Sequence, residues 1–241
     1  MYICLFDIDG TLLSSGGAGK EAMYRAIQAE FQVPEVKDGV PFAGRTDRAI
    51  VRDLFALHAI EDSLANLRRF VAAYLGHLPA CLSERQGKVL PGVSELLEQL
   101  RVRDDVVVGL LTGNLRDGAR TKLGHFGLFH HFAFGGFGDH HLDRNDVARE
   151  ALAELRRHVA GEVSSEQIWV IGDTPLDVRC ARSIGARVVA VATGLHTTDD
   201  LAAERPDILL ANLTDASELF VQLADRKTPG RASDGLLGLV Q

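Results

Sequence analysis

The sequence predicts a protein of the α/β class, with a parallel sheet covered by helices on both faces and a helical domain inserted near its start. Short apolar runs such as Val106–Leu111 and 168–171 alternate with amphipathic segments along most of the chain. These runs are apolar throughout, which indicates strands buried on both faces. By contrast, residues 18–84 have helical periodicity and no strand signal of similar strength. The alternating part therefore predicts a Rossmann-like core, and residues 18–84 predict the helical insertion.

The first elements are expected to be one strand and then a group of helices. Tyr2–Phe6 predicts a buried strand, and the small-residue segment 14–19 after it predicts a hinge. Segment 85–92, which contains Pro91, predicts a second hinge. Between the hinges, apolar residues recur at helical spacing, and we expect them to form the core of a small bundle. The three stripes are Met23, Tyr24, Ile27 and Phe31; Ile50, Val51, Leu54, Phe55 and His58; and Leu64, Leu67, Val71, Tyr74 and Leu78.

Helices and strands are expected to alternate in the remainder of the chain. The predicted strands are Val106–Leu111, 132–137, 168–171, 188–192 and Ile208–Leu210, and the predicted helices are 93–100, 115–126, 144–159, 176–184 and 216–223. The predicted domains are a core formed by residues 1–14 and 90–225, a helical domain at 15–89 and a Gly- and polar-rich tail at 226–241.

Composition and charge narrow the classes of partner. The chain has 241 residues, with 26 Lys and Arg against 33 Asp and Glu, so its formal net charge is −7. A broad nucleic-acid surface needs clustered positive charge, so we expect no nucleic-acid partner. The apolar runs are too short to span a bilayer and no signal peptide is visible, so we expect no membrane association. Cys4, Cys81 and Cys180 are widely spaced, which suits a reducing cytosol and predicts a cytoplasmic protein.

Three apolar strands are followed directly by polar residues. Asp7 and Asp9 follow the first strand, Thr112 closes the second, and Asp173 and Asp177 follow the third. The carboxyl ends of parallel strands meet at one edge of a sheet, so these residues should lie together. A single Asp at a strand end is usually a turn or helix-cap residue. Four carboxylates in one crevice, however, repel each other and need a cation, for which Mg²⁺ is suited.

The spacing of these residues resembles the haloacid dehalogenase superfamily of phosphotransferases. Its first motif, DxDGT, is present as Asp7-Ile8-Asp9-Gly10-Thr11, its second as Thr112, and its fourth, GDxxxD, as Gly172-Asp173-Thr174-Pro175-Leu176-Asp177. The helical insertion resembles the mobile cap of the helical-cap members, and the phosphoglycolate phosphatase-like branch is the most similar. The resemblance covers residues 1–14 and 90–225. It implies a Mg²⁺-dependent hydrolase that acts on a small phosphorylated metabolite.

The resemblance also implies a role for each motif residue. Asp7 would be the nucleophile and form an aspartyl-phosphate, while Asp9 would be the general acid and then the general base. Mg²⁺ would be held by the Asp7 carboxylate, the backbone carbonyl of Asp9 and Asp173, with Asp177 behind them. Phosphoryl oxygens would be bound by Thr112 and by the backbone amides of Gly113 and Asn114, at a helix start.

The family's third motif is a Lys or Arg that neutralises the nucleophile. Its common Lys-Pro form is missing from this chain. Arg144 stands in the expected stretch, at a predicted helix start, and Lys122 on the preceding helix is the alternative. We favour Arg144, because a lone Lys on an amphipathic helix usually lies on the solvated face. The neighbouring pair His140 and His141 lacks other ligands at suitable spacing, and we expect no zinc site there.

Two residues of the insertion are candidate substrate contacts. Arg45 precedes a predicted helix start in Gly44-Arg45-Thr46-Asp47, and Lys20 follows the first hinge. The alternative interpretation makes Thr46 a helix cap, Asp47 a residue favoured by the helix dipole, and Lys20 a solvated residue.

Other activities of the same fold remain open. Asp9 disfavours dehalogenation, because the dehalogenases of this superfamily lack the second Asp of the first motif. A sugar-phosphate mutase shares the core motifs and is the main alternative, and a non-catalytic phospho-receiver-like module is a further one. The sequence does not choose between a monomer and a homodimer.

Overall fold

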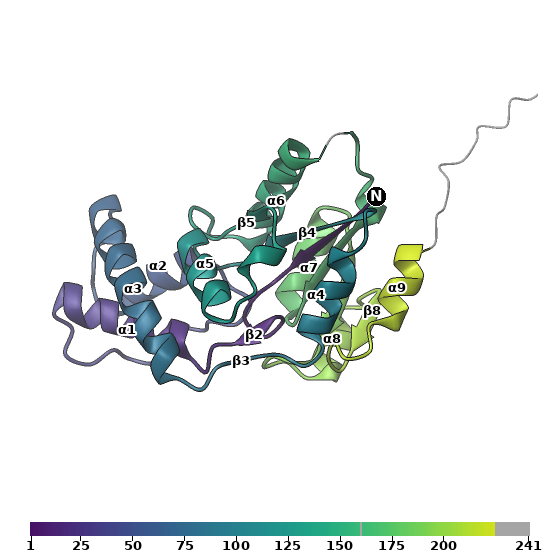
Figure 1. Cartoon of the computed structure of the whole chain (residues 1–241). Helices are drawn as coiled ribbons and strands as arrows, with labels where there is room; N and C mark the ends of the chain where they lie inside the picture. The colour runs from purple at the N-terminus through teal and green to yellow at the C-terminus, as the bar shows by residue number, and fades with distance from the viewer. Residues whose placement is uncertain (160, 225–241) are drawn as a thin grey trace, which may run out of the picture.

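The apolar runs of the chain form one parallel sheet. The structure is a computed structural model and describes residues 1–159 and 161–224 (Figure 1), so the expected tail at 226–241 lies outside the described residues. The strand order is β5-β4-β1-β6-β7-β8, and every neighbouring pair is parallel. The strands are β1 (Tyr2–Phe6), β4 (Val106–Leu111), β5 (Gly135–Gly136), β6 (Ile168–Gly172), β7 (Arg187–Val191) and β8 (Ile208–Leu210).

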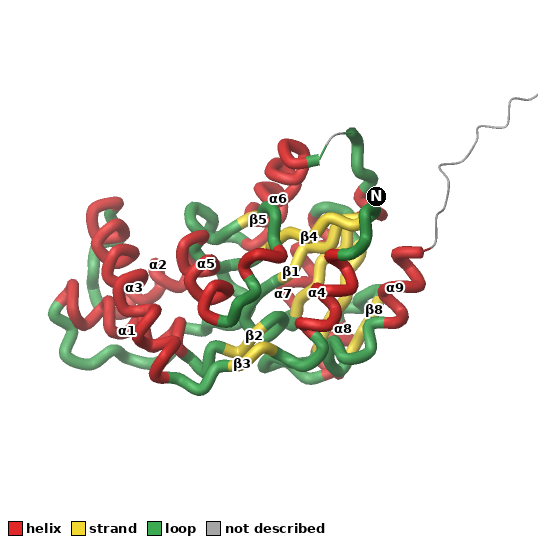
Figure 2. Tube along the Cα trace, in the orientation of Figure 1, coloured by secondary structure: helices red, strands yellow, loops and turns green. Residues whose placement is uncertain are grey.

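Helices cover both faces of this sheet (Figure 2). Successive side chains of a strand point to opposite faces. In β1, Cys4 and Phe6 therefore join one apolar cluster and Ile3 and Leu5 join the other. The first cluster includes α4 (Val93–Arg101), α5 (Arg116–His125) and α9 (Ser217–Ala224), and the second includes α6 (Arg144–His158), α7 (Pro175–Ser183) and α8 (Thr198–Ala203). The predicted fold class is confirmed.

Three helices that follow β1 and β2 in the sequence form a group beside the sheet (Figure 1). They are α1 (Ala18–Phe31), α2 (Asp47–Leu57) and α3 (Leu64–Glu84), and we call them the helical group. Their apolar stripes form a third cluster, which includes Phe55, Phe70 and Tyr74. The expectation that Leu64 belongs to this core is wrong: Leu64 is 72 % exposed, because it begins α3 before the first buried position, Phe70.

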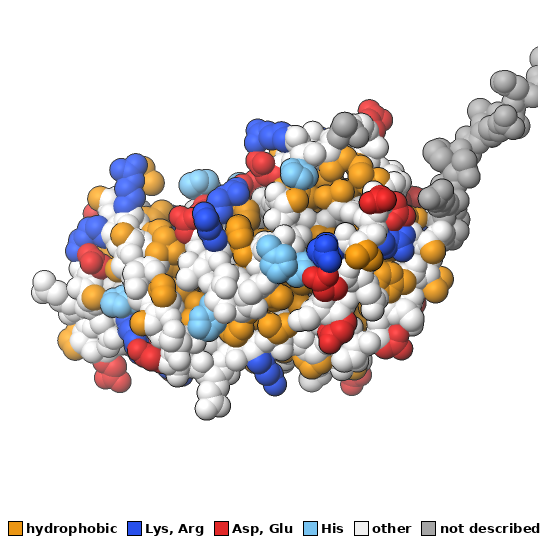
Figure 3. Space-filling model, in the orientation of Figure 1, with side chains coloured by type: hydrophobic (Ala, Val, Ile, Leu, Met, Phe, Trp, Pro, Cys, Tyr) orange, Lys and Arg blue, Asp and Glu red, His pale blue; other side chains and the backbone are white. Residues whose placement is uncertain are grey.

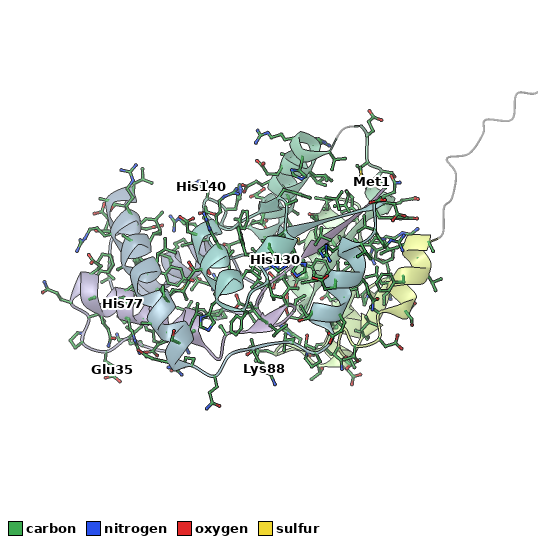
Figure 4. The ribbon with its side chains drawn as sticks, viewed as in Figure 1. Met1, Glu35, His77, Lys88, His130 and His140 are labelled. Carbon is green, nitrogen blue, oxygen red and sulfur yellow. The ribbon has the colours of Figure 1, made fainter. Side chains whose placement is uncertain are left out.

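The two chain segments that connect the helical group to the sheet pair with each other. β2 (Leu13–Ser14) and β3 (Lys88–Val89) form an antiparallel two-stranded sheet, which the sequence analysis missed because two-residue strands have no periodic signal. Lys88 lies at the lower edge of the molecule, between the helical group and the sheet (Figure 4). A Cβ at Gly87 would lie 2.8 Å from the carbonyl oxygen of Ser14, so this close crossing needs glycine.

Some predicted elements are shorter than expected, and some are additional. The predicted strand at 132–137 is reduced to Gly135–Gly136, where a Cβ at Gly136 would lie 2.4 Å from the carbonyl oxygen of Val147 in α6. Helix α6 therefore packs directly on this segment, at a position where only glycine fits. Helix α8 and the short 3₁₀ helices Phe129–His131 and Ser165–Gln167 were not predicted.

Candidate active site

Three neighbouring strands end at the polar residues that the sequence analysis singled out. β1 leads into Asp7, β4 ends before Thr112, and β6 ends before Asp173. The N–H of Asp7 donates to the carbonyl oxygen of Ile171 at 2.9 Å, which extends the pairing of β1 with β6. The hydroxyl of Thr11 donates to Asp173 Oδ1 at 3.1 Å, although the two residues are 162 positions apart. The order β4-β1-β6 therefore brings remote parts of the chain to one sheet edge.

Arg144 is the cation beside Asp7. Its Nη2 lies 2.8 Å from Asp7 Oδ1 and 2.5 Å from Asp177 Oδ1, and the Arg144 side chain is 5 % exposed. Burial raises the pKa of Asp7 to about 6, while the charge of Arg144 opposes that rise. The other end of the guanidinium donates from Nη1 to the carbonyl oxygen of Gly44, at 3.0 Å, and so reaches the segment before α2. Arg144, at the first position of α6, thus contacts both the sheet edge and the inserted segment.

Asp7, Asp173 and Asp177 form a buried cluster of carboxylates. Each offers an oxygen atom, and these atoms lie within 4.8 Å of one another. Both oxygens of Asp177 already have partners: Oδ1 accepts from Arg144, and Oδ2 accepts from the N–H and hydroxyl of Thr174, at 2.9 and 2.7 Å. Asp173 has more capacity for a ligand. Burial raises its pKa well above the usual range, and the charges of Asp177 and Asp7 add to the rise.

The donor set of this cluster fits a divalent cation such as Mg²⁺. Among the described residues, Arg144 is the cation in direct contact with these three buried carboxylates, which leaves negative charge that a metal cation would balance. The donors are all oxygens, as Mg²⁺ prefers. A Cβ at Gly194 would lie 1.7 Å from Asp173 Oδ2, and one at Gly10 would lie 2.3 Å from the same atom. Glycine at both positions therefore keeps the space around the Asp173 carboxylate open.

A second buried cation, Lys122, contacts Asp9. Its Nζ lies 2.5 Å from Asp9 Oδ2 and 2.5 Å from Asn114 Oδ1, and the Asn114 amide donates to the same Asp9 oxygen at 2.9 Å. The expectation that Lys122 lies on the solvated face of its helix is wrong, since its side chain is only 6 % exposed. Burial lowers the pKa of Lys122, but the charges of Asp9 and Asp47 outweigh this and the net direction is upward. Each of Asp7 and Asp9 therefore has its own buried cation.

The segment after β4 lies between the sheet edge and the helical group. Thr112 is fully buried, and its Oγ1 accepts hydrogen bonds from the side chain and the backbone of Asn114, at 2.9 and 3.3 Å. The carbonyl oxygen of Gly113 accepts from the N–H of Asp47 at 2.7 Å. A Cβ at Gly113 would lie 2.1 Å from the carbonyl oxygen of Arg45, so only glycine allows this approach.

A cavity of about 480 Å³ lies between the carboxylates and the helical group. Asp7, Asp9 and Asp173 line it from the sheet edge, and both Lys20 and Arg45 line it from the inserted segment. The two insertion cations already have partners. Lys20 Nζ contacts Asp38 at 2.8 Å and lies over the rings of Tyr24 and Phe42. Arg45 contacts Asp53 at 2.5 Å and the carbonyl oxygen of Pro41 at 3.0 Å.

The sequence analysis did not assign two further lining residues to the site. Asp47 was interpreted only as a helix-start residue; Thr46 does cap α2, but the Asp47 carboxylate is buried and accepts the N–H of Leu115 at 2.8 Å. Tyr74 was interpreted as a core residue, and it is fully buried, yet it also lines the cavity. The available signal for Asp47 was its spacing, because it lies three and four positions before Ile50 and Val51 of a predicted apolar stripe. Nothing distinguished Tyr74 from its apolar neighbours.

Groups elsewhere on the surface form smaller clusters. His130 and His140 lie on separate parts of the face shown, and acidic and basic side chains are interspersed there (Figures 3 and 4). His141 contacts Glu150 at 2.9 Å. His130 and His131 lie near Glu98, but Arg101 already binds that carboxylate at 2.8 Å. Within residues 1–159 and 161–224, no helix is long and apolar enough to cross a bilayer.

Comparisons with known proteins agree with this geometry. The family model of the haloacid dehalogenase-like hydrolases matches residues 4–191. A phosphoglycolate phosphatase of Synechococcus elongatus is 30 % identical over 225 residues, which cover 92 % of this chain and 99 % of that protein. A validoxylamine A 7'-phosphate phosphatase of Streptomyces hygroscopicus subsp. limoneus is 29 % identical, and the match covers 89 % of this chain and 96 % of that protein. The crystal structure of CbbY from Rhodobacter sphaeroides, in complex with phosphate, superposes with a TM-score of 0.71 at 18 % identity, over 89 % of this chain and 96 % of that one.

Proposed function

Because the chain belongs to the haloacid dehalogenase-like hydrolases, we propose that it is a Mg²⁺-dependent phosphatase that hydrolyses a small phosphomonoester through an aspartyl-phosphate. One observation carries the proposal: Asp7 and Asp9 follow the same strand, but each contacts a different buried cation. Arg144 holds the first carboxylate and Lys122 holds the second. Such separation suits two carboxylates with different tasks, since environment decides which one attacks and which one transfers protons.

Asp7 is the nucleophile of the proposed reaction. A carboxylate oxygen of Asp7 forms a bond to phosphorus, and the bond between phosphorus and the leaving alcohol oxygen breaks. Asp7 must be ionised to attack, and with its pKa at about 6 it is largely ionised at neutral pH. Arg144 neutralises the carboxylate and favours the approach of the anionic phosphoryl group.

Asp9 transfers the protons. It donates one to the leaving alcohol oxygen, then accepts one from the water that attacks the aspartyl-phosphate, which releases phosphate and frees Asp7. Lys122 and Asn114 both contact Oδ2 of Asp9. Oδ1 has only a 3.5 Å contact from the hydroxyl of Ser15 among the described residues, so Oδ1 is the oxygen that carries the proton.

Asp7, Asp173 and the backbone carbonyl of Asp9 would hold Mg²⁺, and Asp177 would orient Arg144 behind them. When bound, the ion would reduce the repulsion between the anionic nucleophile and the phosphoryl oxygens. Thr112, Gly113 and Asn114 would bind those oxygens; Gly113 and Asn114 line the cavity. Arg45 and Lys20, on the opposite wall, would stand close to the leaving alcohol.

We further propose that the protein works in the cytoplasm on a free phosphorylated metabolite. All three cysteines are buried free thiols, as expected in a reducing compartment. The phosphatase names of the curated relatives favour hydrolysis over phosphoryl migration, so sugar-phosphate mutase is the second candidate and not the first.

Phosphate release from p-nitrophenyl phosphate tests the proposal. We expect sustained turnover with Mg²⁺, loss of turnover with EDTA, and recovery when Mg²⁺ is restored. Asp7→Asn should abolish turnover and retain the native circular dichroism spectrum. Asp146→Asn is the matched control, because Asp146 lies in the first turn of α6 with a side chain that is 45 % exposed, and it should retain turnover. Stoichiometric labelling without turnover would instead indicate a phospho-receiver, and an isomerised sugar phosphate without released phosphate would indicate a mutase.

A further inference from the structure

The hydroxyl of Tyr74 is a buried polar group that lacks a partner within the protein. Tyr74 is fully buried in α3, where its ring stacks on Phe70 at a centroid distance of 6.2 Å. No hydrogen-bond partner for its Oη exists among the described residues. A buried tyrosine hydroxyl is normally hydrogen-bonded, because leaving it without a partner is unfavourable. Since Tyr74 lines the cavity, a bound molecule can supply the missing partner.

The backbone of α5 packs close to the Tyr74 hydroxyl. A Cβ at Gly118 of α5 would lie only 3.1 Å from Tyr74 Oη, so no side chain from this position of α5 occupies the space beside the hydroxyl. One helical turn later, α5 carries Lys122, which contacts the proposed general acid. The Tyr74 hydroxyl therefore belongs to the part of the cavity next to Asp9, where the leaving alcohol must lie.

Asp47 adds a hydrogen-bond acceptor to the same part of the cavity. Its carboxylate is buried, lines the cavity, and accepts one recorded hydrogen bond among the described residues, from the N–H of Leu115 to Oδ2 at 2.8 Å. Its other oxygen can accept a hydrogen bond from an O–H group. The same negative charge, with Asp9 nearby, repels a carboxylate of the substrate.

The remaining lining residues also disfavour a second anionic group. Recognition of a short carboxylated ester such as phosphoglycolate needs a free cation near the leaving group. The two cations of the insertion that line the cavity, Lys20 and Arg45, are each bound to a carboxylate of the helical group or its loops. Met23, Phe42 and Ile50 add apolar surface to the lining of the same cavity. This wall is thus partly apolar and partly able to bind hydroxyl groups.

We infer that Tyr74 and Asp47 bind hydroxyl groups of the leaving alcohol, so that the substrate is a phosphate ester of a polyhydroxylated ring, such as a sugar or a cyclitol, and not of a small carboxylic acid. A ring polyol has hydroxyl groups along its edge and C–H groups on its face. The hydroxyl groups match the polar part of this wall, and the C–H groups match its apolar part. The inference rests on the proposed phosphatase function, since it assigns the alcohol part of that substrate.

Steady-state kinetics with three esters test the inference: one polyol phosphate, 2-phosphoglycolate and p-nitrophenyl phosphate. The parent protein should hydrolyse glucose 6-phosphate or inositol 1-phosphate with a kcat/KM at least tenfold above that for 2-phosphoglycolate. Tyr74→Phe removes only the hydroxyl, and loss of one such hydrogen bond corresponds to about a three- to tenfold change. We therefore expect the ratio of kcat/KM for the polyol ester to that for p-nitrophenyl phosphate to fall by about this factor. Tyr2→Phe, at the far end of β1, is the matched control and should leave the ratio unchanged.

Two further measurements separate binding from structure. The melting temperature of Tyr74→Phe should equal or exceed that of the parent, because no hydrogen bond within the described protein is lost. Gly118→Ala, which crowds the same hydroxyl, should lower the ratio in the same direction. Preference for 2-phosphoglycolate, or an unchanged ratio in both variants, would overturn the inference and leave the phosphatase proposal standing. Failure to hydrolyse any of the three esters with Mg²⁺ would overturn the proposed function, and this inference with it.

Discussion

Replacement of Arg144 tests how the carboxylate cluster is stabilised. Arg144→Met retains a long apolar side chain but removes the positive charge that contacts Asp7 and Asp177. These side chains are 5 %, 6 % and 0 % exposed, so solvent cannot replace the lost charge. Removing one partner of a buried ion pair typically costs about 3–5 kcal/mol, because the remaining charges stay buried. We expect a loss of this size in the free energy of unfolding at pH 8 without Mg²⁺.

The loss should depend on pH in a defined direction. The pKa of Asp7 in the folded protein is about 6, above its ordinary value of 3.8. Folded protein therefore binds a proton on Asp7 more readily than unfolded protein, and this carboxyl lowers stability as the pH rises from about 4 to 6. Because Arg144 opposes the rise in pKa, its removal should matter most above pH 6, where Asp7 is ionised. At pH 5 the loss should be smaller by about 1 kcal/mol or more.

Urea unfolding followed by circular dichroism at pH 5 and pH 8, in EDTA, measures the loss in the free energy of unfolding and its dependence on pH. Arg157→Met is the matched control: Arg157 lies on the same helix and pairs with Glu154, but its side chain is 75 % exposed. That variant should lose at most about 1 kcal/mol, with no dependence on pH. If Arg144→Met loses no more than the control, or loses the same amount at both pH values, the interpretation of Arg144 as the charge that balances Asp7 is wrong.

Three other perturbations have defined outcomes. Gly194→Ala would place a Cβ 1.7 Å from Asp173 Oδ2, so the Mg²⁺ concentration for half-maximal activity should rise more than tenfold; an unchanged Mg²⁺ titration would contradict the proposed metal site. Lys122→Met removes the charged contact to the proposed general acid and should lower kcat for p-nitrophenyl phosphate by about 10- to 100-fold, with a displaced pH profile; a normal pH profile would exclude this role. Burial raises the pKa of Cys4 and Cys180 to about 12, so a thiol reagent should leave both unlabelled at pH 8 in the native protein and label them in urea, as mass spectrometry of the peptides would show.

The fold could be predicted because its signals are local. Strands such as Val106–Leu111, which are apolar throughout, and the helical stripes of the insertion are periodic over enough residues to be recognised. The pairing of Leu13 with Val89 could not be predicted in this way. It joins two residues that are remote in sequence, and neither strand is long enough to show alternation.

The candidate site was predictable where a residue directly follows a strand. Asp7 and Asp173 take their positions from the sheet itself, so the order of the strands brings them together. Lys122, Asp47 and Tyr74 lie on helices, and whether a helical side chain faces solvent or the cavity depends on what packs against it. Lys122 is buried because the carboxylates around it offset the loss of hydration, which no periodic pattern reveals.

The position of β1 in the sheet has a consequence for synthesis of the protein. β1 leaves the ribosome before its neighbours β4 and β6, which are made about one hundred residues later or more. Until then this apolar strand has two unpaired edges, which are prone to join other chains. The helical group can bury its own apolar cluster in the meantime. Nascent chains that end before Ile168 should therefore depend on chaperones, and those that extend past β6 should not.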